Sequence, residues 1–156
     1  MTTTEWLLVA VVAVLMLFTA LIAAMETVVT RLNLVRALRL AEEGASRART
    51  LVWVLEHRAS AMDALLVLTV SARVAMSAVA TWLGIQLADG VVGAVLAALV
   101  VIVISLTLAE VAPRTVALRH LEGTGLRLAP LMRALTIVAS PLSRAVVAVG
   151  RSLVPT

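Results

Sequence analysis

An uncharged apolar run long enough to cross a membrane is the feature that most constrains this chain. Residues 91–108 carry no charged side chain, and a membrane-spanning helix needs about this length. The run ends at Glu110, and Pro113 follows. A carboxylate at the end of a span is costly unless it faces protein, water or an ion, and a proline frees a carbonyl about one turn earlier. Oxygen ligands gathered at a broken helix suit a hard cation, so Glu110 and Pro113 predict a cation site.

Composition places the whole chain in the membrane class. Of its 156 residues, 62% are hydrophobic and only 3% aromatic, and the mean hydropathy is +1.10. The hydrophobic fraction and the mean hydropathy lie far above those of soluble domains, and the apolar residues are grouped in long runs. We therefore expect an all-α integral membrane protein, with residues 1–156 forming a single transmembrane domain.

Three membrane spans are predicted, over residues of about 6–30, 62–87 and 91–112. A basic amphipathic stretch, about 31–58, separates the first two and is divided near Gly44. After the third span, a break at Gly123 and Gly125 precedes an apolar segment over about 126–153. That segment carries several arginines and is divided by Pro130 and Pro141, so we expect it to lie in the membrane interface.

The arginines predict the orientation. All 13 basic residues are Arg, six of them in segment 31–58 and six in 114–156. The positive-inside rule puts both segments in the cytoplasm and the N-terminus outside the cell membrane. The alternative is a fourth span over 128–149, which would place Arg133 and Arg144 in hydrocarbon at about 2.5–3.5 kcal/mol each. An interfacial helix avoids that cost, which favours three spans.

Several function classes are excluded. All basic residues except Arg73 lie beside the spans, where arginine sets topology or meets anionic membrane lipid. No interleaving of arginine with aromatic residues suggests nucleic-acid binding. The absence of Cys removes thiolate metal sites. No nucleophile–base pair, phosphate loop or cofactor motif is present, so we do not expect an enzyme.

Three ionisable residues in or beside the spans are candidates for a site. Arg73 lies in the middle of the second predicted span and needs a partner or a path to water. Glu26 and Glu110 both reach the inner part of the membrane, on different helices, so an ion pair of Arg73 with either is expected. The alternative is that the two glutamates are interface residues that reach water beside Arg31 and Arg114.

The chain resembles the CNNM/CorC transmembrane domain, the membrane part of magnesium transporters often called hemolysin-like. Four segments carry the resemblance over nearly the whole chain: Met25-Glu26-Thr27, Ala41-Glu42-Glu43-Gly44, Ser77-Ala78-Val79-Ala80-Thr81 and Ala109-Glu110-Val111-Ala112-Pro113-Arg114. The last is similar to the family's Gly-Glu-x-x-Pro-Lys motif.

The resemblance implies a homodimer with three spans per subunit and a C-terminal interfacial belt helix. It also implies an inward-facing acidic cavity that binds Mg²⁺, with export driven by Na⁺. By matching position, Glu110 is the metal-binding glutamate, and Pro113 is the helix break, with Ala109 in place of the family's Gly. Glu26 and Thr27 match the Glu-Thr of the first span.

Two hypotheses follow, because the chain departs from the family. The span-two positions where the family has Asn ligands fall near Thr69 and Arg73, and Met25 replaces a Ser. The paired CBS domains that usually follow do not occur within these 156 residues. The first hypothesis is divalent-cation transport, with Thr69 among the ligands. The second is a non-transporting subunit or scaffold, with a CBS-containing partner, in which Arg73 neutralises the ion-site carboxylates.

Overall fold

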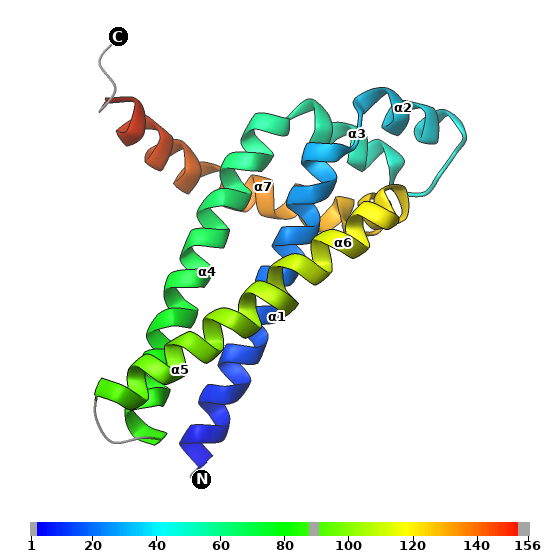
Figure 1. The fold of residues 1–156 in the computed structure, drawn as a ribbon. Coiled ribbons are helices and arrows are strands. Elements are labelled where there is room, and N and C mark those ends of the chain that lie inside the picture. Colours follow the sequence, from blue (N-terminus) through cyan, green and yellow to red (C-terminus); the bar gives the residue numbers. More distant parts are fainter. Residues whose placement is uncertain (1–2, 88–90, 153–156) are drawn as a thin grey trace. The chain divides into compact units, whose positions relative to one another are not determined.

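The computed structural model describes residues 3–87 and 91–152, and this part of the chain consists of helices joined by short turns (Figure 1). The elements are α1 (Thr3–Arg31), α2 (Leu34–Glu42), α3 (Ala48–Glu56), α4 (Arg58–Leu87), α5 (Val91–Ile104), the π-helix η1 (Ser105–Val111), α6 (Ala112–Arg119) and α7 (Leu121–Ser152). The loop expected at 88–90 lies outside the described residues. The all-α membrane fold predicted from composition is confirmed.

Four stretches of the described residues are long and apolar enough to cross a membrane. They are Trp6–Arg31, Arg58–Trp82, Val91–Arg119 and Leu121–Val149. The first and third contain predicted spans, and the second covers the predicted span 62–87 as far as Trp82. The fourth belongs to α7, which we expected in the interface. Length and composition are thus compatible with three spans or with four.

The basic stretch between the first two predicted spans forms two short helices, α2 and α3. The Asn33 side chain caps α2 by accepting a hydrogen bond from the Val35 N–H at 3.2 Å, as an N-cap asparagine does. After α2 ends, Gly44 has φ of +78°, a left-handed conformation that glycine adopts without a steric penalty. The division predicted near Gly44 is therefore confirmed.

The break predicted at Gly123 and Gly125 is wrong, because α7 begins at Leu121 and continues through both residues. Close packing accounts for Gly125: a Cβ there would lie 3.1 Å from Val28 and 3.3 Å from Leu51. Glycine is less favourable than alanine inside a helix by about 1 kcal/mol, and close packing of this kind outweighs that cost.

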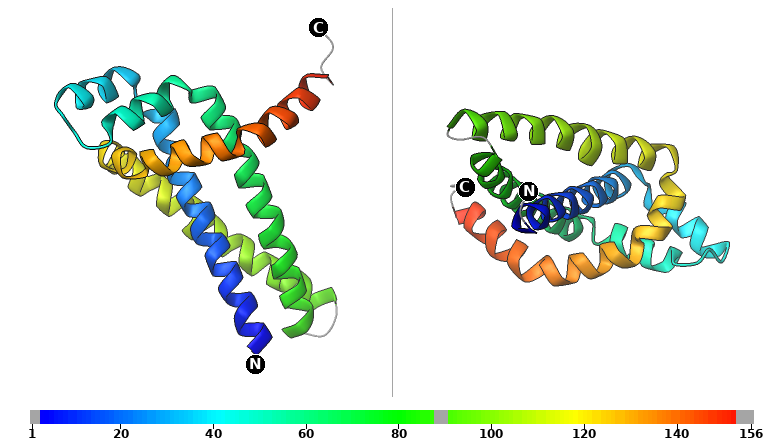
Figure 2. Two further views of the ribbon diagram at one scale, coloured as in Figure 1. Left: turned by 180° about the vertical axis from the view of Figure 1, so that it is seen from behind. Right: turned by 90° about the horizontal axis from the view of Figure 1, so that it is seen from below.

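The division of α7 at its two prolines is also wrong. Pro130 and Pro141 lie inside the helix, which Figure 2 shows as one long curved element. Each proline removes one backbone hydrogen bond and crowds the preceding turn. The helix accommodates this by bending, as helices commonly do at proline.

The described residues divide into two compact units, each with its own interior. The second unit comprises Ala24–Leu68 and the residues from Val116 onward. Its core includes Met25, Leu51, Val54 and Met132, all less than 2% exposed. These side chains come from α1, α3 and α7, and Figures 1 and 2 show α3 beside α7.

The first unit comprises the residues up to Ala23 and Thr69–Thr115. Its helices α4 and α5 approach closely at Gly84, where a Cβ would lie 2.6 Å from the Ala97 Cβ and 3.0 Å from the Ala94 Cα. Small residues allow such contacts between membrane helices. Large apolar side chains of α5, including Leu96, Leu99 and Val103, are more than half exposed, as expected for a lipid-facing surface.

We expect Gly84→Ala to destabilise the protein, because the added methyl group meets backbone and Cβ atoms of α5 that cannot move independently. A loss of about 1–3 kcal/mol is typical for such overpacking. Gly123→Ala is the matched control, since its Cβ meets nothing within 4 Å. Thermal unfolding in detergent would compare the two, and equal melting temperatures would contradict the close α4–α5 contact.

Candidate functional site

Within the third predicted span, the backbone hydrogen bonds change from the α to the π pattern at Ser105, one turn before the motif that begins at Ala109. Between α5 and α6, residues 105–111 form the π-helix η1, and the Ala112 N–H bonds to the Thr107 carbonyl, five residues back. The next residue, Pro113, has no N–H to donate. The helix break predicted at Ala109 and Pro113 is therefore wrong: the chain stays helical to Arg119. The wider turn admits the proline without interrupting the helix.

The π-helix determines which way Glu110 faces. A π turn holds one residue more than an α turn, and one residue corresponds to about 100° of rotation around an α-helix. Residues after the start of η1 are thus rotated relative to an unbroken α-helix. Within η1, Ser105 and Ala109 are buried and Glu110 is partly buried. π segments of this kind occur frequently at functional sites.

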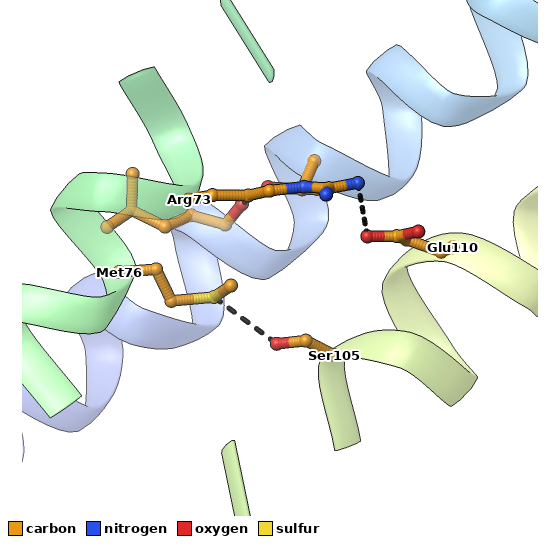
Figure 3. A network of polar contacts seen from close by, with 6 residues as sticks. Arg73, Met76, Ser105 and Glu110 are labelled. Carbon is orange, nitrogen blue, oxygen red and sulfur yellow. Dashed lines mark hydrogen bonds and ion pairs between the residues drawn. The ribbon is translucent and has the colours of Figure 1, made fainter. Parts of the chain in front are cut away.

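Arg73 and Glu110 form an ion pair within the first unit. The Arg73 Nη2 atom lies 2.5 Å from the Glu110 Oε1 atom, and Figure 3 shows the guanidinium of α4 directed at the carboxylate of η1. The side chains are 48% and 19% exposed, respectively. Glu110 is thus one of the two partners expected for Arg73. A charge-assisted hydrogen bond of this length is among the stronger polar contacts in proteins.

The ion pair lies at a mainly apolar cavity of about 260 Å³. Its polar lining comprises Thr19, Arg73, Ser77, Ser105 and Glu110, and the rest is apolar or sulfur-containing: Met76, Ala80, Ala98, Val101, Ile102 and Leu106. The Ser105 hydroxyl donates to the Met76 sulfur at 3.5 Å (Figure 3). The Thr19 hydroxyl donates to the Leu15 carbonyl at 2.8 Å within α1.

The other predicted ligands do not line this cavity. Thr69 lies one turn before Arg73 on α4, in the same unit, but is not part of the lining. Glu26 and Thr27 belong to α1 in the second unit, where Thr27 is buried and Glu26 partly buried. Their role as ligands stays a prediction.

Sequence reasoning placed little weight on the hydroxyl and thioether groups of the cavity. Ser77 and Ser105 are hydroxyl residues inside predicted spans, where most such groups bond to their own helix. Thr107 does so, donating to the Val103 carbonyl at 2.9 Å, whereas Ser105 turns toward Met76. Both residues lie within η1, and apolar spacing does not reveal which hydroxyl faces the cavity.

The charges at the cavity balance. One guanidinium faces one carboxylate, and the remaining polar lining is three hydroxyl groups. Within residues 3–87 and 91–152, no three or more His, Cys, Asp or Glu residues group together as metal ligands. Mg²⁺ favours octahedral oxygen coordination with carboxylates and water, and the only carboxylate lining this cavity already contacts an arginine.

The ion pair predicts non-additive stability effects. Glu110→Gln leaves the Arg73 guanidinium without its carboxylate and should lower the melting temperature, as should Arg73→Gln. The double variant removes both charges and should be more stable than the sum of the single effects predicts, with a coupling of roughly 1–2 kcal/mol. Thermal unfolding of the four proteins in detergent measures this cycle, and additive effects would show that the pair contributes nothing.

Comparison with known proteins agrees with the architecture. The family model of the cyclin M transmembrane N-terminal domain, CNNM, matches residues 10–155. This match spans both compact units and includes α4, η1 and α7. No curated protein matches the chain significantly. The chain belongs to the CNNM family of membrane domains, as its motifs in α1, α4 and η1 predicted.

Proposed function

We propose that this chain is a membrane subunit of a cation-transporter family in which Arg73 takes the place of the transported ion. The observation that carries the proposal is the 2.5 Å contact between Arg73 and Glu110. Glu110 occupies the position of the family's metal-binding glutamate, and its carboxylate contacts a side chain of the same protein. In this function the domain acts as a non-transporting scaffold or regulatory subunit.

Electrostatic repulsion between Mg²⁺ and the Arg73 guanidinium supports the proposal. An ion bound to Glu110 would lie within about 5 Å of the guanidinium, where a divalent and a monovalent cation repel by roughly 6–7 kcal/mol at an effective dielectric constant of about 20. A single carboxylate and three hydroxyl groups offer little to offset this repulsion. The guanidinium, in contrast, is always protonated and satisfies the carboxylate directly.

The second candidate is Mg²⁺ transport, with export driven by Na⁺. The family match supports it, and so does the 48% exposure of the Arg73 side chain, which leaves it room to rotate away. In this function the arginine would gate the site, and Thr69 of the same unit would add an oxygen ligand to Glu110.

Both candidates share one proposed assembly: a homodimer in the cell membrane, with three spans per subunit and the N-terminus outside. In this arrangement α7 is an interfacial belt helix. The Arg133 guanidinium of α7 lies 5.1 Å from the centre of the Trp53 ring of α3, a cation–π contact that stabilises the charged group. An interfacial α7 would also keep Arg133 and Arg144 out of the hydrocarbon. A CBS-containing partner protein would complete the assembly.

The two candidates differ in their affinity for Mg²⁺. Isothermal calorimetry on detergent-purified protein should detect no tight binding to the wild type. It should detect binding to Arg73→Asn, because removal of the guanidinium exposes the Glu110 carboxylate. Adding Glu110→Ala to Arg73→Asn should abolish the gained binding.

Arg49→Asn is the matched control, because Arg49 is an exposed arginine of α3 in the second unit. It removes the same charge and should gain no binding. Tight Mg²⁺ binding to the wild type that Glu110→Ala abolishes would reject the arginine-locked proposal and favour the transporter.

Three and four spans predict different positions for the end of α7. The chain has no Cys, so single cysteines at Thr4, Ser46 and Ser152 are unique labelling sites. With three spans, Ser46 and Ser152 should be labelled from the cytoplasmic side and Thr4 from the outside. Labelling of Thr4 and Ser152 from the same side would instead establish the four-span alternative.

A further inference from the structure

A second cavity, of about 510 Å³, lies entirely within the second unit. It is formed by the end of α1, the start of α2, the end of α6 and the start of α7. Its polar lining contains Arg31, Asn33, Arg36, Arg119, His120 and Glu122. We call it the basic cleft. It plays no part in the cation site proposed above.

The basic cleft has unpaired positive charge. Arg36 donates a hydrogen bond to Glu122, the only carboxylate of the lining. Arg31 and Arg119 make no side-chain hydrogen bond or ion pair with any residue in the described part of the chain. The cleft therefore carries two guanidinium groups that no side chain among the described residues neutralises.

The ends of two membrane-length apolar stretches place the basic cleft beside the membrane surface. Trp6–Arg31 ends in it at Arg31 and Val91–Arg119 ends in it at Arg119. Arg31 directly follows the first predicted span and Arg119 lies about two turns after the third, positions at which arginine meets anionic lipid. This placement does not depend on whether the chain has three spans or four.

Apolar side chains complete the lining. Leu32, Leu118 and Leu121 border the same cavity as the arginines, and Leu118 is 49% exposed. A soluble phosphate compound has no apolar group that would contact these leucines, whereas a lipid has an apolar part next to its phosphate. The combination of guanidinium groups and exposed leucine fits an amphipathic anion.

We propose that the basic cleft binds a phosphate group, and that the phosphate belongs to an anionic membrane lipid. Arg31 and Arg119 donate charge-assisted hydrogen bonds to the phosphate oxygens, a geometry for which the planar guanidinium is well suited. Leu118 contacts the glycerol and acyl part of the same lipid. The bound headgroup thereby ties the end of α1 to the junction of α6 and α7.

Calorimetric titration of the full chain in neutral detergent tests the proposal. Short-chain phosphatidic acid is the probe, short-chain phosphatidylcholine the zwitterionic comparison, and glycerol 3-phosphate the soluble source of the same phosphate. Phosphatidic acid should bind most tightly. Arg31→Gln with Arg119→Gln should weaken its binding by about tenfold or more, the loss expected from charged hydrogen bonds.

The matched control is Arg39→Gln with Arg49→Gln, which removes the same charge from exposed residues of α2 and α3 outside the basic cleft. Equal weakening by both double variants would overturn the proposal in favour of diffuse attraction. Glycerol 3-phosphate binding as tightly as phosphatidic acid would overturn the lipid as the source. Glu122→Gln frees Arg36 and should strengthen phosphatidic acid binding several-fold. Misfolding of the variant could not produce such a gain. Unchanged or weaker binding would count against the proposal.

Discussion

Hydrogen bonding of the backbone is the constraint on which this structure depends. In the hydrocarbon of a membrane no water is available to satisfy a free N–H or carbonyl, so each span must pair its own backbone groups. A proline at the end of a span conflicts with that requirement. The chain resolves the conflict with a π segment, in which the residue before Pro113 bonds five residues back. The chain stays helical, and the π segment determines which way Glu110 faces in the candidate site.

The same environment explains the pairing of charges. An arginine in the middle of a span and a carboxylate near the end of another would each be costly alone. Together, Arg73 and Glu110 satisfy one another at 2.5 Å, and the cavity they share is otherwise mainly apolar. A site neutralised within the protein has little electrostatic attraction left for a metal ion. Arg73 of α4 thus determines what the Glu110 carboxylate contacts.

Apolar run length predicted most of the fold. The three predicted spans lie within α1, α4 and the continuous α5–η1–α6 helix, and the division near Gly44 has the expected left-handed glycine. Prediction failed at Gly125, where close packing outweighs local preference, and at the prolines of α7, which the helix accommodates. At the site, charge in a span pointed to Arg73 and Glu110, but the direction in which Glu110 faces depends on the π-helix η1, which has no simple sequence signal.

The length of η1 is as important to this site as its side chains. A π turn is equivalent to an α turn with one inserted residue, so deletion of a single residue within Ser105–Val111 would leave a normal α-helix. The segment that follows would then be rotated by about 100°, and Glu110 would leave the face that meets Arg73. Insertions and deletions in this short stretch are therefore expected to be far less tolerated than substitutions on the lipid-facing side of α5, although both lie in the same continuous helix.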